Sequence, residues 1–205
     1  MLNIRFKGIC KNEEELKKNT KLYKNSVMFN EEKTMKEHIK KSEKIMFTAV
    51  IIIMLSALIV ADLKNVELEF HLIDLSGILL IIPLALIYEI IIVLSYPIKA
   101  NKDFYLIKKD LALVLISNSL ISKKRYIIIC LIPIIVLLVI PYILSIITMG
   151  IIPIKITKLL IIISLLACVI TALNIIEIYN TLKQVPKGGK IFNYGNHSYW
   201  IDNKN

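Results

Sequence analysis

The sequence predicts an all-α membrane protein with four transmembrane helices, a polar cytoplasmic head, a cytoplasmic middle loop and a short tail. Hydrophobic residues make up 56% of the 205-residue chain, more than an ordinary soluble domain of this size contains. They gather in four runs, and a helix needs about 20 apolar residues to cross a bilayer. None of the runs shows the period-two alternation of a membrane β-barrel, so helices are the expected spanning form.

The polar head covers residues 1–44 and carries twelve Lys and Arg residues and seven acidic residues. Two short apolar patches within it, IRFKGI at 4–9 and SVMF at 26–29, are candidates for strands. The segment NEEELKK at 12–18 has the features of a helix start, with Asn at the N-cap and acids in the first turn. We expect no secretory signal sequence, because the head lacks a short apolar core followed by a small-residue cleavage site.

The four predicted spans cover residues 45–61, 75–98, 126–148 and 159–179. Together with the loop at 99–125 they form a predicted transmembrane domain over 45–179, which a tail over 180–205 follows. The first run is close to the shortest length that crosses a bilayer.

The distribution of basic residues predicts the orientation of these spans. The head carries twelve Lys and Arg residues, the loop at 99–125 carries seven and the tail carries four. The two alternate loops, at 62–74 and 149–158, carry one and two. By the positive-inside rule we expect a multi-pass protein of the cell membrane whose two termini and middle loop are cytoplasmic.

The middle loop contains the stretches FYLI and LALVLISN on either side of KKD, which predicts two short strands around a turn. The alternative is an amphipathic helix on the membrane surface. Its basic end, Lys123 to Arg125, directly precedes the third span, where we expect it to meet anionic headgroups.

The tail begins with a helix-breaking segment that contains Pro186, Gly188 and Gly189. Its aromatic residues have two interpretations, as an anchor at the membrane interface or as a cover over the cytoplasmic end of the helices. They are Tyr194, Tyr199 and Trp200.

Two carboxylates lie inside the predicted spans, although a charged side chain at the centre of a span costs roughly 2.5–3.5 kcal/mol. Glu89 lies in the second span and Glu177 near the end of the fourth. With Tyr88 and Asn174 they lie at similar predicted depth, so a polar cluster is geometrically feasible. An intramembrane acid is a candidate site residue. The structural alternatives are a neutral, hydrogen-bonded Glu89 and a Glu177 that reaches the interface.

Several stretches resemble a family of bacterial four-span membrane proteins known as putative zincin peptidases, a domain of unknown function. RFKGICKNEEEL and KNSVMF resemble its amino-terminal segment, and the stretch from ISNSL to IPYIL resembles the loop and third span. The most specific stretches are QVPKG and SYW near the carboxyl end. The resemblance covers most of the chain and implies membrane-embedded zinc peptidase chemistry.

The chain departs from the family at the residues that bind zinc. The resemblance implies an HExxH motif in the second span, whose two histidines share one helix face and bind zinc while the glutamate activates water. The matching stretch here is YEIII, so Glu89 keeps the position of the base while Tyr88 and Ile92 replace the histidines. A further acidic ligand implied in the fourth span matches Asn174. The three histidines of the chain, His38, His71 and His197, show no metal-ligand spacing.

The leading hypothesis is therefore a non-catalytic relative of an intramembrane zinc peptidase, a pseudoenzyme with Glu89 as a vestigial base. Its expected partners are the lipid bilayer and another membrane protein or segment, with no cofactor and no nucleic acid. One alternative is an active, divergent peptidase that binds zinc through other ligands. Another is a small proton-linked transporter or scaffold in which Glu89 and Glu177 titrate, although the sequence lacks the internal repeat typical of transporters.

Overall fold

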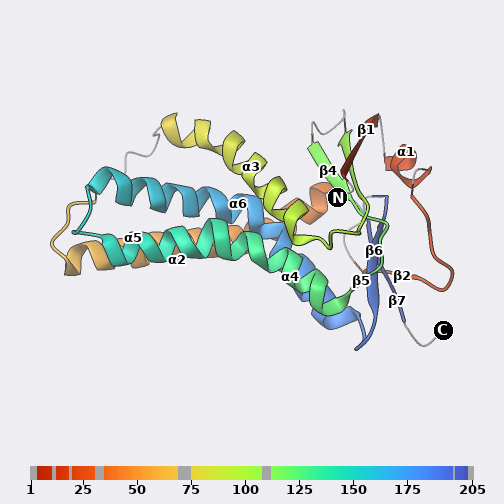
Figure 1. Ribbon diagram of the computed structural model, residues 1–205. Coiled ribbons are helices and arrows are strands. Elements are labelled where there is room, and N and C mark those ends of the chain that lie inside the picture. Colours follow the sequence, from red (N-terminus) through yellow and green to blue (C-terminus); the bar gives the residue numbers. More distant parts are fainter. Residues whose placement is uncertain are drawn as a thin grey trace. The chain divides into compact units, whose positions relative to one another are not determined.

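The computed structural model describes residues 4–10, 13–18, 20–30, 35–68, 75–107, 112–195 and 197–202 (Figure 1). The chain forms two compact units. The first comprises Met1–Glu31, Val93–Ile129 and Glu177–Asn205, and the second comprises Glu32–Ile92 and Cys130–Ile176. The ends of three apolar helices thus belong to the first unit, and the helix bodies belong to the second.

The helices follow the predicted apolar runs and extend beyond most of them. The third run is one continuous helical stretch in which a π-helical segment, η1, separates two α-helices. Pro133 and Pro141, which lack a backbone N–H, lie on either side of η1 and account for the change in hydrogen bonding. The elements are α2 (Met35–Leu63), α3 (Leu75–Ser95), α4 (Lys123–Pro133), η1 (Ile134–Val139), α5 (Ile140–Thr148) and α6 (Ile154–Gln184).

Three stretches within the described residues are helical, long enough and apolar enough to cross a membrane: Lys40–Leu63, Lys123–Thr148 and Ile154–Gln184. They confirm the first, third and fourth predicted spans as candidates. Helix α3 has 21 residues, of which Leu79–Ser95 are described with their side chains and form a shorter apolar stretch than these three. A fourth span therefore remains a prediction.

In the second unit, α2 packs against α5 and α6, which run beside it (Figure 1). Ala57 and Ala61, one turn apart on α2, are buried in a cluster with Met149, Ile161 and Cys168. Small side chains at this spacing let helix backbones approach closely, which is the usual way that helices associate in a membrane.

Lys64, just beyond the end of α2, holds the end of α5. Its ammonium group donates to the carbonyl oxygens of Ile146, Ile147 and Met149 at 2.9, 3.2 and 3.0 Å. Ile146 and Ile147 lie in the last turn of α5, where carbonyls lack partners within the helix, and a cation is favourable at a helix carboxyl end. Lys64, the only basic residue in the sequence of the 62–74 loop, therefore has a structural role.

The first unit contains a three-stranded sheet formed by β1 (Ile4–Cys10), β3 (Lys102–Ile107) and β4 (Ala112–Ile116). The antiparallel pair of β3 and β4 confirms the hairpin predicted in the middle loop. β1, from the first apolar patch of the head, pairs with β3 in parallel. Helix α1 (Glu13–Lys18) contributes Leu16 to a buried cluster with Cys10, Tyr105 and Ile116.

A second, four-stranded sheet has the order β2-β7-β6-β5, and the prediction of an all-α chain with one hairpin did not include it. Its strands are β2 (Val27–Met28), β5 (Ile121–Ser122), β6 (Lys190–Tyr194) and β7 (His197–Ile201). The head, the middle loop and the tail all contribute strands. The tail aromatics pack within this sheet, because Tyr199 stacks on Phe192 at 5.8 Å and Tyr194 meets Tyr199 edge-on at 5.7 Å between ring centroids.

The basic start of α4 binds the ends of two other helices. Lys123 donates from Nζ to the carbonyl oxygen of Leu182 at 3.1 Å and also to that of Val185, at the end of α6. Arg125 donates to the carbonyl oxygen of Ser95 at 2.6 Å, at the end of α3. Two of the three basic residues expected at lipid headgroups thus satisfy helix carbonyls within the protein, and Lys124 is exposed.

The stretch QVPKGG forms the tight turn between α6 and β6. The amide of Gly189 donates to the carbonyl oxygen of Pro186 at 3.1 Å, and Gly188 has φ 90°, which the third position of a type II turn requires. A side-chain carbon at Gly189 would lie 2.7 Å from Val185 Cγ1 and 3.2 Å from the Pro186 oxygen. The local fold therefore needs glycine at this position.

We predict that Gly189→Ala lowers the free energy of unfolding of the protein by about 1–2 kcal/mol, since overpacking forces its neighbours to move. Thermal unfolding in mild detergent, followed by the fluorescence of the single tryptophan, measures the change. Lys187→Ala is the matched control, because Lys187 is exposed in the same turn. Equal stability of the two variants would contradict the clash.

Candidate functional site

Tyr88 on α3 and Asn174 on α6 are joined by a hydrogen bond. The Tyr88 hydroxyl donates to Asn174 Oδ1 at 2.8 Å. These are two of the three positions that the family resemblance assigns to metal ligands. The structure therefore brings together two site residues that the sequence predicts at similar depth, one from each helix.

The apolar cluster beside this pair holds α3, η1 and α6 together. Leu84, Leu137 and Ala167 are buried at its centre, and Tyr88 and Ile91 pack against it from α3. Leu137 belongs to the π-helical segment, and such segments occur often at functional sites of proteins. The side of α3 that carries Tyr88 thus faces the protein interior.

The side-chain amide of Asn174 has a hydrogen-bond partner for its oxygen but not for its nitrogen among the described residues. Its side chain is 5% exposed, and Nδ2 is buried with no hydrogen-bond acceptor among the residues that the structure describes. An unsatisfied buried donor costs about 1–3 kcal/mol, so such a group calls for a partner. The site therefore offers one buried N–H donor beside the Tyr88 hydroxyl.

Glu89 and Ile92, the other two positions of the YEIII stretch, are half-buried in α3. Ile92 lies one turn after Tyr88, at the position of the second family histidine. Glu89 is the only carboxylate of this stretch. Its neighbour Tyr88 donates its hydroxyl to Asn174. The placement of Glu89 one residue from the Tyr88–Asn174 pair is the reason to keep it as a candidate site residue.

Glu177 lies one turn beyond Asn174 on α6 but belongs to the first unit. Its Oε2 accepts a hydrogen bond at 2.9 Å from the hydroxyl of Tyr126, at the start of the α4 helix. The same hydroxyl lies 3.3 Å from Oγ of Ser198 in β7. Ser198 is the first residue of the SYW stretch, so this stretch has a structural role in joining β7 to two helices.

The donor groups at the site do not match a zinc centre. Tetrahedral zinc takes histidine, cysteine or carboxylate ligands, whereas Tyr88 uses its hydroxyl as a donor to a neutral amide and Ile92 has no donor atom. Among the described residues, no group of three or more His, Cys, Asp or Glu could hold a metal ion. His197 lies in β7 opposite Tyr194, His71 lies outside the described residues, and so does the side chain of His38.

We predict that the Tyr88–Asn174 bond couples the two residues energetically by about 1 kcal/mol, a usual size for hydrogen bonds between membrane helices. A double-mutant cycle with Tyr88→Phe and Asn174→Leu measures this coupling from thermal unfolding in mild detergent. Additive effects of the two substitutions would show that the bond does not stabilise the protein.

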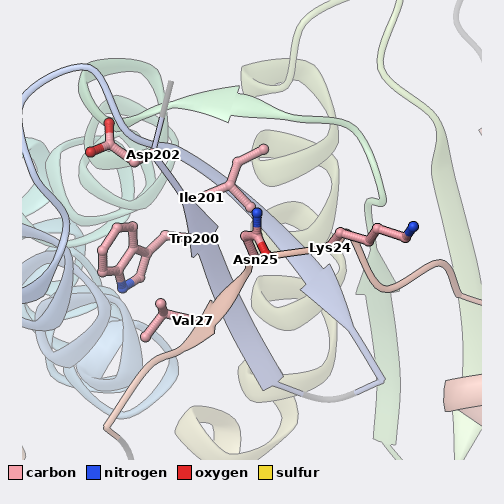
Figure 2. Close-up of a pocket in the computed structure, with 6 residues that line it drawn as sticks. All are labelled: Lys24, Asn25, Val27, Trp200, Ile201 and Asp202. Atoms are coloured by element: carbon pink, nitrogen blue, oxygen red, sulfur yellow. The ribbon is translucent and has the colours of Figure 1, made fainter. Parts of the chain in front are cut away.

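The first unit has a surface pocket of about 380 Å³ at the edge of the four-stranded sheet (Figure 2). Val27 of β2 and Trp200 of β7 are register partners there. The full lining is Lys24, Asn25, Val27, Trp200, Ile201 and Asp202. Of these residues, only Trp200 is prominent in the sequence, because the pocket combines residues from two separate segments and follows no sequence motif.

Comparison with known protein families gives a match. A family model described as putative zincin peptidase matches residues 78–189, which is more than half of the chain. The match includes most of α3 with Tyr88 and Glu89, α6 with Asn174, and the turn at QVPKGG. No curated protein and no solved structure matches the chain. The chain therefore belongs to the putative zincin peptidase family.

Proposed function

We propose that this protein is a non-catalytic member of its family that binds a membrane segment of another protein without cutting it. The observation that carries the proposal is the hydrogen bond of 2.8 Å between Tyr88 and Asn174. It occupies two positions where an active member needs metal ligands. In place of a metal centre it provides a neutral, polar contact between two helices.

Loss of the ligands removes the chemistry that Glu89 would assist. In zinc peptidases the metal lowers the pKa of its bound water, and the glutamate takes the proton from that water. Neither Tyr88 nor Ile92 nor Asn174 supplies a good zinc ligand. Glu89 is then a single carboxyl group in an apolar helix, available for hydrogen bonding rather than for hydrolysis.

The unused donor of Asn174 supports a role in binding. A transmembrane segment offers acceptor oxygens where a proline or glycine frees a backbone carbonyl, or where it carries a polar side chain. Asn174 Nδ2 is buried without an acceptor among the described residues, so an acceptor from a partner would relieve its desolvation. The proposed ligand is thus an apolar helix with one such exposed acceptor.

The proposed orientation places both termini and the middle loop in the cytoplasm. The excess of Lys and Arg in the head, middle loop and tail supports it. The contacts of Lys64 also support it. Lys64 is the one basic residue of the 62–74 loop, and its binding to the end of α5 accounts for a lysine on the side opposite the cytoplasm.

Photo-crosslinking tests the proposed binding. A photoreactive amino acid at Ile92, half-buried beside the site, is expected to form an adduct with an intact membrane protein in native membranes. The same amino acid at Leu86, 57% exposed on α3, is the positional control. Asn174→Leu should abolish the Ile92 adduct. An adduct that forms equally at Leu86, or that survives Asn174→Leu, would overturn the proposal, and a cleaved partner would favour an active peptidase.

A further inference from the structure

One face of the three-stranded sheet in the first unit is apolar. The β1–β3 register places Ile4 beside Lys102, Phe6 beside Phe104 and Ile9 beside Leu106, and a bulge at Lys7 keeps the two sets aligned. Because paired residues project to the same side, these apolar residues share one face. We call Ile4, Phe6, Ile9, Phe104, Leu106 and Leu115 the apolar sheet face; Leu115 joins it as the register partner of Phe104.

This face is open, whereas the opposite face is covered. Phe6 is 66% exposed, Ile9 61% and Ile4 45%. On the other side, Leu16 of α1 and Tyr105 are almost completely buried in the α1 cluster. A contiguous apolar face on a sheet edge is an aggregation hazard in water, so we expect it to have a cover.

The strands are held close to the ends of apolar helices. β3 begins seven residues after α3 ends at Ser95, and α4 begins immediately after β5 at Lys123. Seven residues reach at most about 25 Å. Arg125 further ties the start of α4 to the Ser95 carbonyl at 2.6 Å. A unit that includes these helix ends is therefore expected at the surface of a bilayer that the helices enter.

The charge of the first unit fits a lipid surface. Lys7, Lys99 and Lys124 are exposed in this unit, and the apolar sheet face has no acidic residue at its described positions. Asp103 projects to the opposite side, where it lies 3.7 Å from Arg5. Exposed apolar side chains together with exposed lysines in one unit are typical of segments that lie in the interface of an anionic membrane.

Lys102 projects to the same side of the sheet as the apolar sheet face, at an end where this side is covered. Its side chain is completely buried, and its ammonium group has no hydrogen-bond partner among the described residues. Burial lowers the pKa of Lys102 below the ordinary value for lysine. The exposed region therefore begins beyond Lys102 and is formed by the apolar side chains alone.

We propose that the apolar sheet face lies in the interfacial layer of the membrane, with Phe6 and Ile9 inserted among the lipid chains. The three-stranded sheet is then a membrane-surface element that fixes the first unit against the bilayer. This inference does not depend on whether the Tyr88 site binds a partner or a metal.

Depth-dependent quenching tests the proposal on the full-length protein in vesicles of phosphatidylcholine and phosphatidylglycerol. Trp200→Phe removes the single tryptophan, and Phe6→Trp then reports on the apolar sheet face. Leu22→Trp in the same background is the control, because Leu22 is 48% exposed in the same unit but lies outside that sheet. If Phe6→Trp fails to fold, Ile9→Trp replaces it.

Lipids with brominated acyl chains are expected to quench the Phe6→Trp variant roughly twofold or more above the Leu22→Trp control, as for an inserted interfacial residue. Removing phosphatidylglycerol should weaken this quenching. Equal quenching of the two variants would overturn the proposal. The proposal would also be overturned if brominated lipid did not quench the emission and the emission wavelength changed with protein concentration. A second copy of the chain would then cover the apolar sheet face.

Discussion

Replacing Tyr88, Ile92 and Asn174 with histidine, histidine and aspartate is expected to raise the zinc content from background to about one ion per chain. The hydrogen bond of 2.8 Å between Tyr88 and Asn174 shows that α3 and α6 already present two of these positions to each other. Residues one helical turn apart share a face, so a histidine at 92 joins a histidine at 88. The three substitutions supply ligands and leave the surrounding apolar cluster in place.

Metal analysis of protein purified in mild detergent without chelator measures this effect. The matched control places histidines at Leu86 and Ile90, which have the same spacing on α3 but are both 57% exposed. This control is expected to stay at background. Stoichiometric zinc in the unsubstituted protein would refute the non-catalytic proposal and direct attention to an active, divergent peptidase.

Glu89 provides a second readout from the same variant. If Glu89 keeps the position of the catalytic base, the triple variant should cleave a model transmembrane peptide. Adding Glu89→Gln should abolish that cleavage while zinc stays bound, because the glutamate is not one of the expected ligands. Loss of both zinc and cleavage would instead make Glu89 a ligand.

The membrane helices could be predicted because long apolar runs have few other structural outcomes. The three confirmed candidates are longer than the runs themselves, because polar end residues such as Lys123 and Lys158 continue the helices. The second run is harder, because α3 also packs Leu84, Tyr88 and Ile91 into a cluster within the protein. Burial in the protein and burial in lipid give the same composition, so composition alone does not decide between them.

The sheets were only partly predictable. The β3–β4 hairpin is local, and its two apolar stretches flank a polar turn in the sequence. The β6–β7 hairpin has an equally local signal, the dipeptide Gly-Asn at 195–196 between aromatic strands, and Gly195 has the positive φ of 60° that such turns require. The parallel pairing of β1 with β3 has no local signal, because two apolar helices separate these strands in the sequence.

The candidate site shows the same division. Equal depth predicted that Tyr88 and Asn174 could meet, and the structure joins them. The partner of Glu177 depends instead on which face α4 turns towards α6, and helix rotation is set by packing. Tyr126 lies at the start of the third span, where a tyrosine is usually interpreted as an interfacial anchor. Its role as a hydrogen-bond donor to Glu177 therefore has no signal in the sequence.

Tyr126→Phe is expected to lower the free energy of unfolding by about 2 kcal/mol, because the hydroxyl bonds a carboxylate in a buried setting. Tyr126 is 6% exposed, and its hydroxyl lies 2.9 Å from Glu177 Oε2 and 3.3 Å from Ser198 Oγ. Phenylalanine keeps the ring and removes only this donor. The substitution removes a hydroxyl that contacts side chains of both α6 and β7.

The fluorescence of Trp200 reports this loss directly, because the single tryptophan lies two residues after Ser198 in the same strand. Tyr179→Phe is the matched control on α6, where the side chain is 55% exposed and a change within about 0.5 kcal/mol is expected. Glu177→Gln keeps an acceptor for Tyr126 and should destabilise the protein less than Tyr126→Phe does. If the Tyr126 and Tyr179 variants unfold alike, the hydroxyl contributes nothing, and packing alone attaches the β7 strand to the helices.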